Sequence, residues 1–339
     1  MPKLKQKTID GEERIKHFYS EEWFGEDGEG QIYMRYYTMP FPPKDDFFIP
    51  GLDGEEVLFN GVPFKVGLAH ISGQDYKSHF AWLINFESGK PEIHVEEIQR
   101  MLPEANYIIV TTPITDTSER AYDITSELMD GFVGMLRLVG GNNLLRQLIR
   151  EAAVDITTRD MKTLTRPVPF PQEIEGPFVT KETWDQFKEV LDAISTKDDT
   201  EGKRLTLATK LIEKAFFAEV GFKFFNYWVA LEVAADTQGH QSIISLLAKA
   251  YGKNNSYVQN YLGFQHLWET RTAMFHHGES YEMPYDVERY MQCIILDVMR
   301  SKLELAPNGY MAAAVGSGFD VTHLNRNVAQ AKTATIDIP

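Results

Sequence analysis

Apolar and polar residues alternate in short segments of the first third of the chain, a pattern that predicts β-strands. Two such segments are Gln31–Thr38 and Ser78–Glu87, and Tyr107–Thr112 is rich in β-branched residues. His94–Met101 instead has helical spacing and is closed by a proline. We therefore expect residues 1–116 to form a small α+β domain of unknown role.

The strongest local signal in this region is a β-hairpin. Asn60-Gly61 separates Val57–Phe59 from Val62–Leu68, and Asn-Gly suits the two-residue turn that joins antiparallel strands. Pro63 has no backbone N–H to donate, so we expect the second strand of this hairpin at an edge of its sheet.

Helical spacing of apolar residues follows from Ser118 to Ile156. It is interrupted at Gly140-Gly141, which predicts a pair of helices joined by a tight turn. Four prolines then mark a linker, because they cannot continue a helix. The expected organisation is an α+β domain (1–116), a helical segment (117–165), a Pro-rich linker (166–177), a helical domain (178–305) and a tail (306–339).

The helical domain is predicted from apolar residues that recur at spacings of three and four. Gly252 is suited to end one helix in the left-handed conformation, and Pro284 to open the last one, where its missing N–H is not needed. We expect a bundle that buries Trp184, Phe187, Leu191 and Ile194; Leu205, Ala208, Ile212 and Phe216; Val220, Phe224, Tyr227, Trp228, Leu231 and Ala235; Ile244, Leu247, Ala248 and Tyr251; and Tyr290, Met291, Ile294, Ile295 and Val298.

One predicted helix, residues 256–278, carries a charged residue on its apolar face. Arg271 lies three residues after Trp268 and four before Phe275, on the face formed by Tyr257, Tyr261, Phe264, Trp268 and Phe275. Because an arginine keeps its charge, it needs a carboxylate partner, a path to water, or a place at an interface or active site. Glu232 lies equally close to the apolar face of its own helix, so a pair with Arg271 would satisfy both.

Two histidines, His276 and His277, fall in the last turn of this helix. The helix dipole favours a charged imidazolium there, a setting suited to proton transfer. The same dipole favours basic residues at any helix C-terminus, so a plain capping role stays open. A zinc site with His266 is disfavoured, because zinc needs three or four convergent ligands and His266 is ten residues back. We expect no metal and no cofactor.

Composition and charge exclude several classes of protein. The formal net charge of −15 argues against a protein that coats nucleic acid through an overall positive field. Residues 203–305 hold about 11 basic and about 11 acidic residues, so the acidic excess lies elsewhere. Cys293 is the single cysteine, which excludes an internal disulfide and fits a reducing compartment. No stretch approaches the roughly 20 apolar residues of a membrane span, and we expect a cytoplasmic protein without a membrane partner.

Three segments in this order resemble the HEPN superfamily, and most closely its ApeA-like branch. They are Tyr227–Glu232, Leu267–Gly278 and the apolar helix that follows Pro284. The family motif is an arginine followed, after about four to six residues, by a histidine, and Arg271 and His276 match it. The resemblance covers roughly 100 residues, all of them in the helical domain.

The resemblance implies a metal-independent endoribonuclease that works as a homodimer and pairs two Arg/His motifs at the subunit interface. The RNA 2′-hydroxyl would attack the adjacent phosphate, with His276 as general base or acid and Arg271 stabilising charge on the phosphate oxygens. Glu232, Thr272 and His277 are the expected supporting residues, and Thr272 stands where the family often has Asn, Asp or Ser. A toxin or anti-phage abortive-infection effector would fit, with a trigger or regulatory partner acting on the N-terminal domain.

Two other classes of function are alternatives to this one. The first is a catalytically inactive HEPN-like dimerisation or adaptor protein, which would keep Arg271 and His276 for structural reasons. The second is a small-molecule or metal enzyme in the N-terminal domain. It is disfavoured because His70, His79 and His94 lack a credible ligand arrangement. Cleavage of RNA separates the nuclease from the adaptor.

Overall fold

The computed structural model describes residues 19–24, 30–38, 53–71, 105–141, 145, 147–155, 161–165, 181–219, 222–277, 283 and 285–307. The chain forms two compact units, each described by itself. Unit one contains Met1–Met129 and Asn142–Leu191, and unit two contains Asp130–Gly141 and Asp192–Pro339. The predicted α+β class is confirmed, because unit one holds an antiparallel sheet and the described part of unit two is helical. Within these ranges no helix has the length and apolar character needed to cross a membrane.

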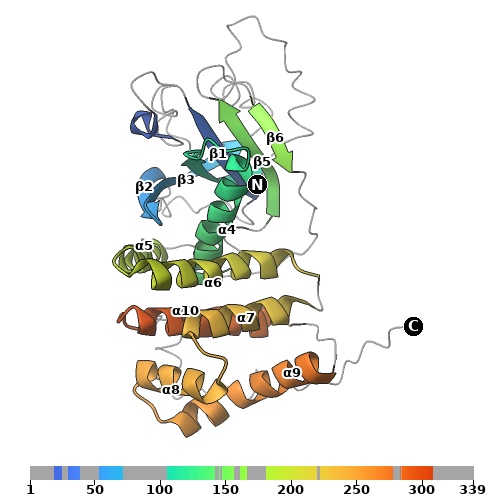
Figure 1. Ribbon diagram of the computed structural model, residues 1–339. Coiled ribbons are helices and arrows are strands. Elements are labelled where there is room, and N and C mark those ends of the chain that lie inside the picture. Colours follow the sequence, from blue (N-terminus) through green and yellow to red (C-terminus); the bar gives the residue numbers. More distant parts are fainter. Residues whose placement is uncertain are drawn as a thin grey trace, which may run out of the picture. The chain divides into compact units, whose positions relative to one another are not determined.

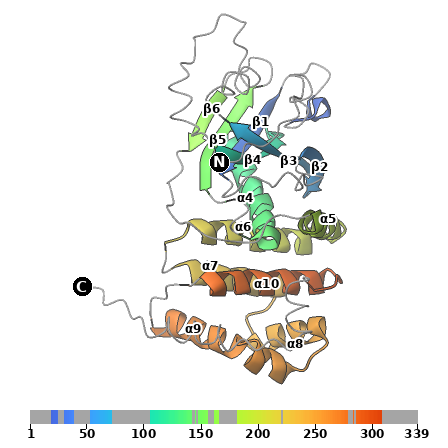
Figure 2. The same cartoon turned by 180° about the vertical axis from the view of Figure 1, so that it is seen from behind.

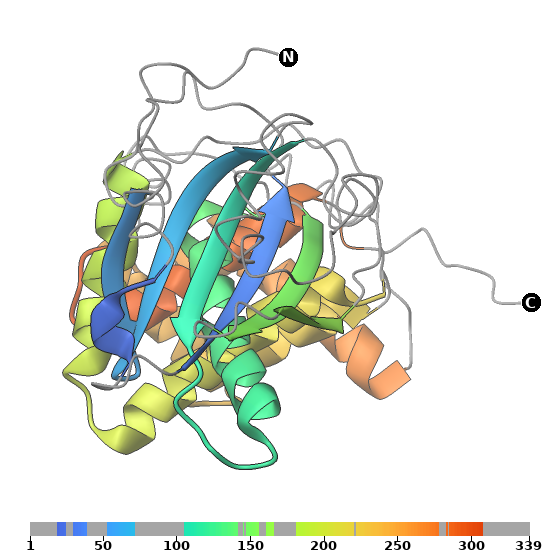
Figure 3. The same ribbon diagram turned by 90° about the horizontal axis from the view of Figure 1, so that it is seen from above.

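The strands of unit one pair into one sheet. They are β1 (Gln31–Thr38), β2 (Asp53–Phe59), β3 (Val62–Ile71), β4 (Ala105–Pro113), β5 (Gln147–Asp155) and β6 (Met161–Thr165), preceded by a short 3-10 helix, η1 (Glu21–Trp23). Their order is β2-β3-β4-β1-β5-β6, and all neighbours are antiparallel (Figure 3). The strands predicted at 31–38 and 107–112 are confirmed.

The predicted hairpin is also confirmed. Asn60 and Gly61 have φ angles of 52° and 75°, and positive φ at both positions is what the two-residue turn requires. The expectation from Pro63 is wrong, because β3 pairs with both β2 and β4, so β2 is the edge strand on this side. The proline is tolerated because pairing with β4 starts only at Lys65, beyond the missing N–H.

The prediction of a helix after Gly140-Gly141 is wrong. The first helix of the expected pair is α4 (Ala121–Gly140), but β5 and β6 follow it within the predicted helical segment 117–165. Strand β5 contains Arg, Glu and two Ala, which favour a helix locally. Pairing with β1 on one side and β6 on the other overrides that preference.

Strands β1 and β5 share a buried ion pair. Arg35 lies opposite Glu151, and its Nε donates to Oε1 of that carboxylate at 2.7 Å. The Tyr33 hydroxyl donates to the same carboxylate, and Arg35 Nη2 donates to Ser126 Oγ at 3.0 Å. Burial, together with the Glu151 charge, raises the pKa of Tyr33 well above its ordinary value. The cluster is satisfied within the sheet and α4, which is the condition for burying charge there.

Amphipathic helices build unit two. Unit two includes the part of α4 from Asp130 onward and the part of α5 (Lys181–Ser195) from Asp192 onward. The others are α6 (Asp199–Phe217), α7 (Lys223–Ala235), α8 (His240–Tyr251), the π-helical turn η4 (Tyr257–Tyr261), α9 (Phe264–His277) and α10 (Tyr285–Lys302). Helices α7 and α10 lie side by side (Figures 1 and 2). Of the side chains predicted to be buried, those that the structure describes are buried, except for Phe216 and Tyr251, which are half-buried.

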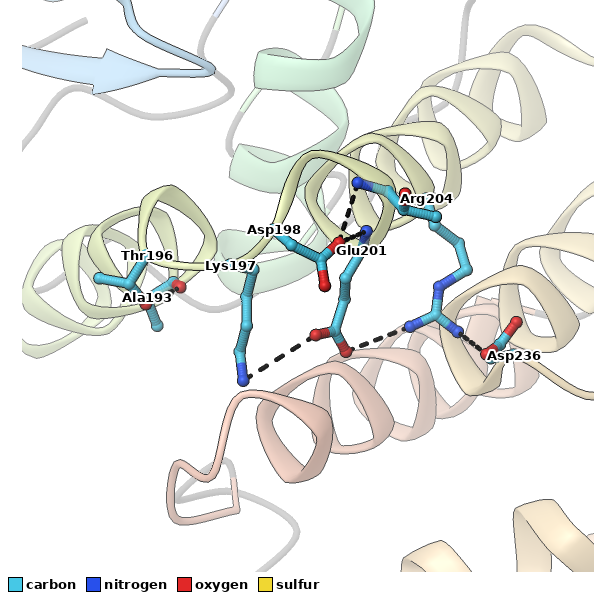
Figure 4. Close-up of polar contacts among 8 residues, drawn as sticks. Ala193, Thr196, Lys197, Asp198, Glu201, Arg204 and Asp236 are labelled. Carbon is cyan, nitrogen blue, oxygen red and sulfur yellow. Dashed lines mark hydrogen bonds and ion pairs between the residues drawn. The ribbon is translucent and has the colours of Figure 1, made fainter.

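Local signals set the ends of these helices. Asp198 caps α6, because its Oδ1 accepts hydrogen bonds from the backbone N–H groups of Thr200 and Glu201, both at 2.9 Å (Figure 4). Arg204 then links Glu201, at 3.2 Å, to Asp236 at the end of α7, at 3.0 Å. Gly252 ends α8 with a φ of 62°, so the predicted left-handed cap is confirmed.

The helix predicted for residues 256–278 is not continuous. It is divided into η4 and α9, and Gly263 between them has a φ of 66°. A left-handed glycine cannot continue a right-handed helix, so a new helix starts at Phe264. Arg271 and His276 therefore belong to a shorter helix than expected. The tyrosines of η4 lie on a separate element, and Tyr261, which was predicted on the apolar face, is 56% exposed.

Helices α4 and α6 approach closely within unit two. A Cβ atom on Gly134 would lie 1.8 Å from the backbone oxygen of Thr209. One turn further along, Arg137 forms a buried ion pair with Glu213, and its guanidinium carbon lies 3.6 Å from the centroid of the Phe216 ring. Only glycine permits this approach, which brings the two buried charges together.

Some predictions fall outside the described residues. They are the strand at 78–87, the helix at 94–101, the linker at 166–177, the burial of Val220, Pro284 as the first residue of the last helix, and the tail beyond residue 307.

Candidate active site

The residues of the HEPN-like motif lie on α9, where it packs against α7. Figures 1 and 2 draw α9 next to α8, in a layer beside the one that holds α7 and α10. Aromatic rings fill the contact between α7 and α9. The Trp228 and Trp268 centroids are 5.7 Å apart, and Phe225 stacks on Phe275 at 4.6 Å with planes inclined by 17°. Arg271 therefore lies beside a cluster of aromatic rings, here called the aromatic wall, formed by Phe225 and Trp228 of α7 and Trp268 and Phe275 of α9.

Arg271 has the carboxylate partner that its position on the apolar face demands. Its Nη2 lies 3.6 Å from Glu232 Oε1, and the two side chains are only 16% and 13% exposed. Trp228 Nε1 donates to the same carboxylate oxygen at 2.7 Å, which fixes Glu232 on α7. The predicted pair between Glu232 and Arg271 is thus present, and it is partly shielded from water.

Two rings of α9 hold the guanidinium from its own helix. Its Cζ atom lies 5.1 Å from the centroid of Trp268 and 4.3 Å from that of Phe275, distances at which a cation is attracted by the ring faces. Arg271 Nε is buried and has no hydrogen-bond partner among the described residues. Stacking and the single ion pair therefore orient the guanidinium and leave donor capacity unused.

His276 lies at the exposed end of the same helix. Its Nε2 is 3.4 Å from Arg271 Nη1. Five residues turn an α-helix through about 500°, so the two Cα–Cβ bonds diverge by about 140° and the long arginine side chain bridges the difference. The guanidinium has donors and no acceptor, so a hydrogen bond here runs from Arg271 to the imidazole. The contact places the imidazole beside a fixed positive charge.

The other predicted site residues stand further from this pair. Thr272 Oγ1 donates to the backbone oxygen of Trp268 at 2.9 Å, so its hydroxyl is engaged within α9. His277 is exposed in the last turn. His266 lies 3.7 Å from Glu269 rather than beside the other histidines. Across the described ranges, no three His, Cys, Asp or Glu side chains are grouped as metal ligands.

Sequence reasoning missed part of the aromatic wall. Trp268 and Phe275 were recognised as neighbours of Arg271 but not as its supports. Phe225 was not recognised, although it lies seven residues before Glu232 and so shares a face of α7 with it. His240, whose ring stacks on Trp268 at 4.5 Å, comes from the start of α8, and its sequence position gives no signal of that contact.

Comparison with known proteins identifies no relative of this chain. No protein-family model, no curated protein and no solved structure matches the chain. The chemistry of the site is therefore argued from the side chains that α7 and α9 bring together.

Proposed function

We propose that this chain is an endoribonuclease of HEPN type that needs no metal ion. The observation that carries the proposal is the contact of 3.4 Å between Arg271 Nη1 and His276 Nε2 at the exposed end of α9. It joins a fixed positive charge to a group that can move a proton, and both are needed to cleave a phosphodiester by internal attack. An arginine held only for stability would not need an exposed histidine beside it.

The proposed chemistry uses the two groups that this contact brings together. A neutral His276 accepts the proton of the RNA 2′-hydroxyl as that oxygen attacks the adjacent phosphorus. Arg271 donates to the non-bridging oxygens, whose negative charge grows in the transition state. The bond from phosphorus to the 5′-oxygen breaks, and a protonated histidine supplies the proton that this leaving oxygen needs. The products are a 2′,3′-cyclic phosphate and a 5′-hydroxyl.

We also propose that the enzyme is a homodimer through unit two. Phe222 and Phe225 of α7 are exposed in the single chain, at 61% and 39%, and Phe225 stacks on the aromatic wall of the site. A symmetric partner would cover these rings and bring a second Arg/His pair near the first. Unit one would then restrain or trigger the nuclease, as in a toxin or an anti-phage abortive-infection effector.

One observation favours a second candidate, a catalytically inactive adaptor of the same family. Arg271 is already held by two rings and by Glu232, and the Thr272 hydroxyl is engaged within its helix. An arginine whose only role is to join α9 to α7 would make the same ion pair with Glu232. The two candidates differ in what His276 does.

The test is cleavage of a mixed RNA pool by the full chain in the presence of a metal chelator. We expect the wild type to produce 2′,3′-cyclic phosphate ends and His276→Ala to lose about 10²- to 10⁴-fold in rate. Because His276 is exposed, that variant should lose no more than about 1 kcal/mol of stability. Equal cleavage by His276→Ala contradicts the catalytic assignment, and a dimeric wild type that cleaves no RNA supports the adaptor.

A further inference from the structure

A stretch of the sequence that leads into α9 contains no acidic residue. From Thr237 to Trp268 the sequence has no Asp or Glu, although the chain carries 49 of them in 339 residues. At that average frequency, a stretch of this length would hold about four or five. It does contain Lys249 and Lys253, and it comprises α8, η4 and the first turn of α9. On a chain with a net charge of −15, this stretch repels a polyanion less than the rest of the chain does.

Two tyrosines of η4 form an aromatic stack within this stretch. The Tyr257 and Tyr261 centroids are 5.3 Å apart, and their planes are inclined by 21°. The Tyr257 hydroxyl is buried, so the inner ring is fixed, whereas Tyr261 is 56% exposed. The Lys253 ammonium lies 5.3 Å from the Tyr257 centroid. A nucleobase can stack on the exposed Tyr261 ring, and its phosphate can contact the Lys253 ammonium.

The groups around the stack are neutral amides and hydroxyls. The Asn254 side chain accepts from the Tyr257 N–H at 2.8 Å, and Asn260 donates to Ser256 Oγ at 3.0 Å. The first carboxylate after the stretch is Glu269, which accepts from Gln265 at 3.2 Å and lies 3.7 Å from a nitrogen of His266. An apolar protein partner would require a drier and less polar surface than this one.

We propose that the surface formed by Lys253, Tyr257 and Tyr261, here called the η4 surface, binds single-stranded RNA by stacking an unpaired base on Tyr261. The inference rests on the proposed function, because it takes RNA as the ligand. Helix α9 begins three residues after Tyr261 and rises about 10 Å from Phe264 to Arg271. A strand bound at the η4 surface can thus continue along α9 to the catalytic pair. The stack needs a free base face, so the surface selects unpaired RNA over a duplex.

The test measures binding of a fluorescein-labelled single-stranded RNA to the full chain with His276→Ala, which prevents turnover. Adding Tyr261→Ala should weaken binding by about 5- to 150-fold, the range for loss of one stacked base. Tyr261→Trp should bind like the parent, whereas Tyr261→Leu, which keeps apolar bulk without a ring, should bind like Tyr261→Ala. Lys253→Gln should lower the slope of log affinity against log salt by about 0.7. The matched control, Lys203→Gln on an exposed lysine paired with Asp199, should leave that slope unchanged.

A second readout separates this proposal from the nuclease proposal. With His276 restored, Tyr261→Ala should cleave a dinucleotide at the wild-type rate and a long single strand more slowly, since a dinucleotide does not reach the η4 surface. If the wild type cleaves RNA but Tyr261→Ala and Lys253→Gln bind it unchanged, the η4 surface is not the binding site and the nuclease stands. If no RNA is cleaved but binding still depends on the Tyr261 ring, the nuclease fails and the η4 surface stands. Wild-type binding by Tyr261→Leu, or a change of oligomeric mass in Tyr261→Ala, would overturn the proposal in favour of a protein contact.

Discussion

Replacing Glu232 by Gln tests whether one carboxylate both holds α9 and orients Arg271, the arginine proposed to be catalytic. The glutamine keeps an oxygen that accepts from Trp228 Nε1, so the change removes the charge without leaving the indole unpaired. Arg271 loses its partner at 3.6 Å. It keeps its stacking on Trp268 and Phe275. The perturbation is therefore confined to the ion pair.

The size of the effect follows from distance and exposure. Two unit charges at this separation attract by about 4–5 kcal/mol at an effective dielectric constant of about 20. Desolvation of both groups offsets most of that, and their 16% and 13% exposure adds screening by water. We expect Glu232→Gln to lower the free energy of unfolding by about 1–2 kcal/mol, and cleavage to fall by about tenfold because Arg271 is no longer fixed.

The assay is a double-mutant cycle by urea denaturation, with wild type, Glu232→Gln, Arg271→Ala and the double variant. A coupling energy of about 1 kcal/mol is expected, because Arg271→Ala removes the interaction that Glu232→Gln also removes. The matched control is Glu269→Gln, an exposed carboxylate on α9, which should change stability by less than about 0.5 kcal/mol. Additivity within about 0.3 kcal/mol would show that the two side chains do not interact, and the account of Arg271 given above would fail.

Two further predictions concern the interior of unit two. Gly134→Ala should cost about 3 kcal/mol, because its Cβ would lie 1.8 Å from a backbone oxygen of α6. Gly202→Ala, whose Cβ would have its nearest neighbour at 3.9 Å, should raise the free energy of unfolding by about 0.5–1 kcal/mol. Urea denaturation measures both variants, and effects of the same sign would contradict the close approach of α4 and α6. Burial raises the pKa of the Cys293 thiol to about 11, so the folded state keeps a proton that the unfolded chain releases near pH 9, and stability should fall as pH rises between about 9 and 11. Wild type should therefore lose about 1 kcal/mol more than Cys293→Ala between pH 8 and pH 10, and equal losses would contradict this.

Short-range signals in the sequence predicted the elements whose cause is local. Asn60-Gly61 specifies its hairpin because both residues accept positive φ, and Gly252 ends α8 for the same reason. The helices of unit two follow from apolar spacing, because a stripe of apolar side chains must be buried whatever it packs against. The pair between Glu232 and Arg271 was predictable as well, since each residue lies where a lone charge would be costly.

Long-range pairing decided the elements that were predicted wrongly. Strand β5 has a helix-favouring composition, and only its position between β1 and β6 makes it a strand. Pro63 suggests an edge strand when read alone, but the ladder with β4 starts two residues later and never meets it. The break in the helix at Gly263 could not be predicted because apolar residues continue on both sides of it. The spacing of apolar residues carries no information on the φ angle of the glycine.

The site shows the same division between local and distant causes. Arg271 and His276 are five residues apart, so a motif can name them, but their supports Phe225 and Glu232 come from another helix. Of α9, only Phe264, Leu267 and Thr270 are buried, and all three precede Arg271. The half of α9 that carries the proposed catalytic residues is thus held by Glu232 and by the stack of Phe225 on Phe275 rather than by a buried apolar face. It follows that the contacts which orient Arg271 are also those which keep this half of the helix in place. If Arg271 and His276 are catalytic, a change in these contacts should lower stability and cleavage together, whereas a change at the exposed His276 should lower cleavage with at most about 1 kcal/mol of stability lost.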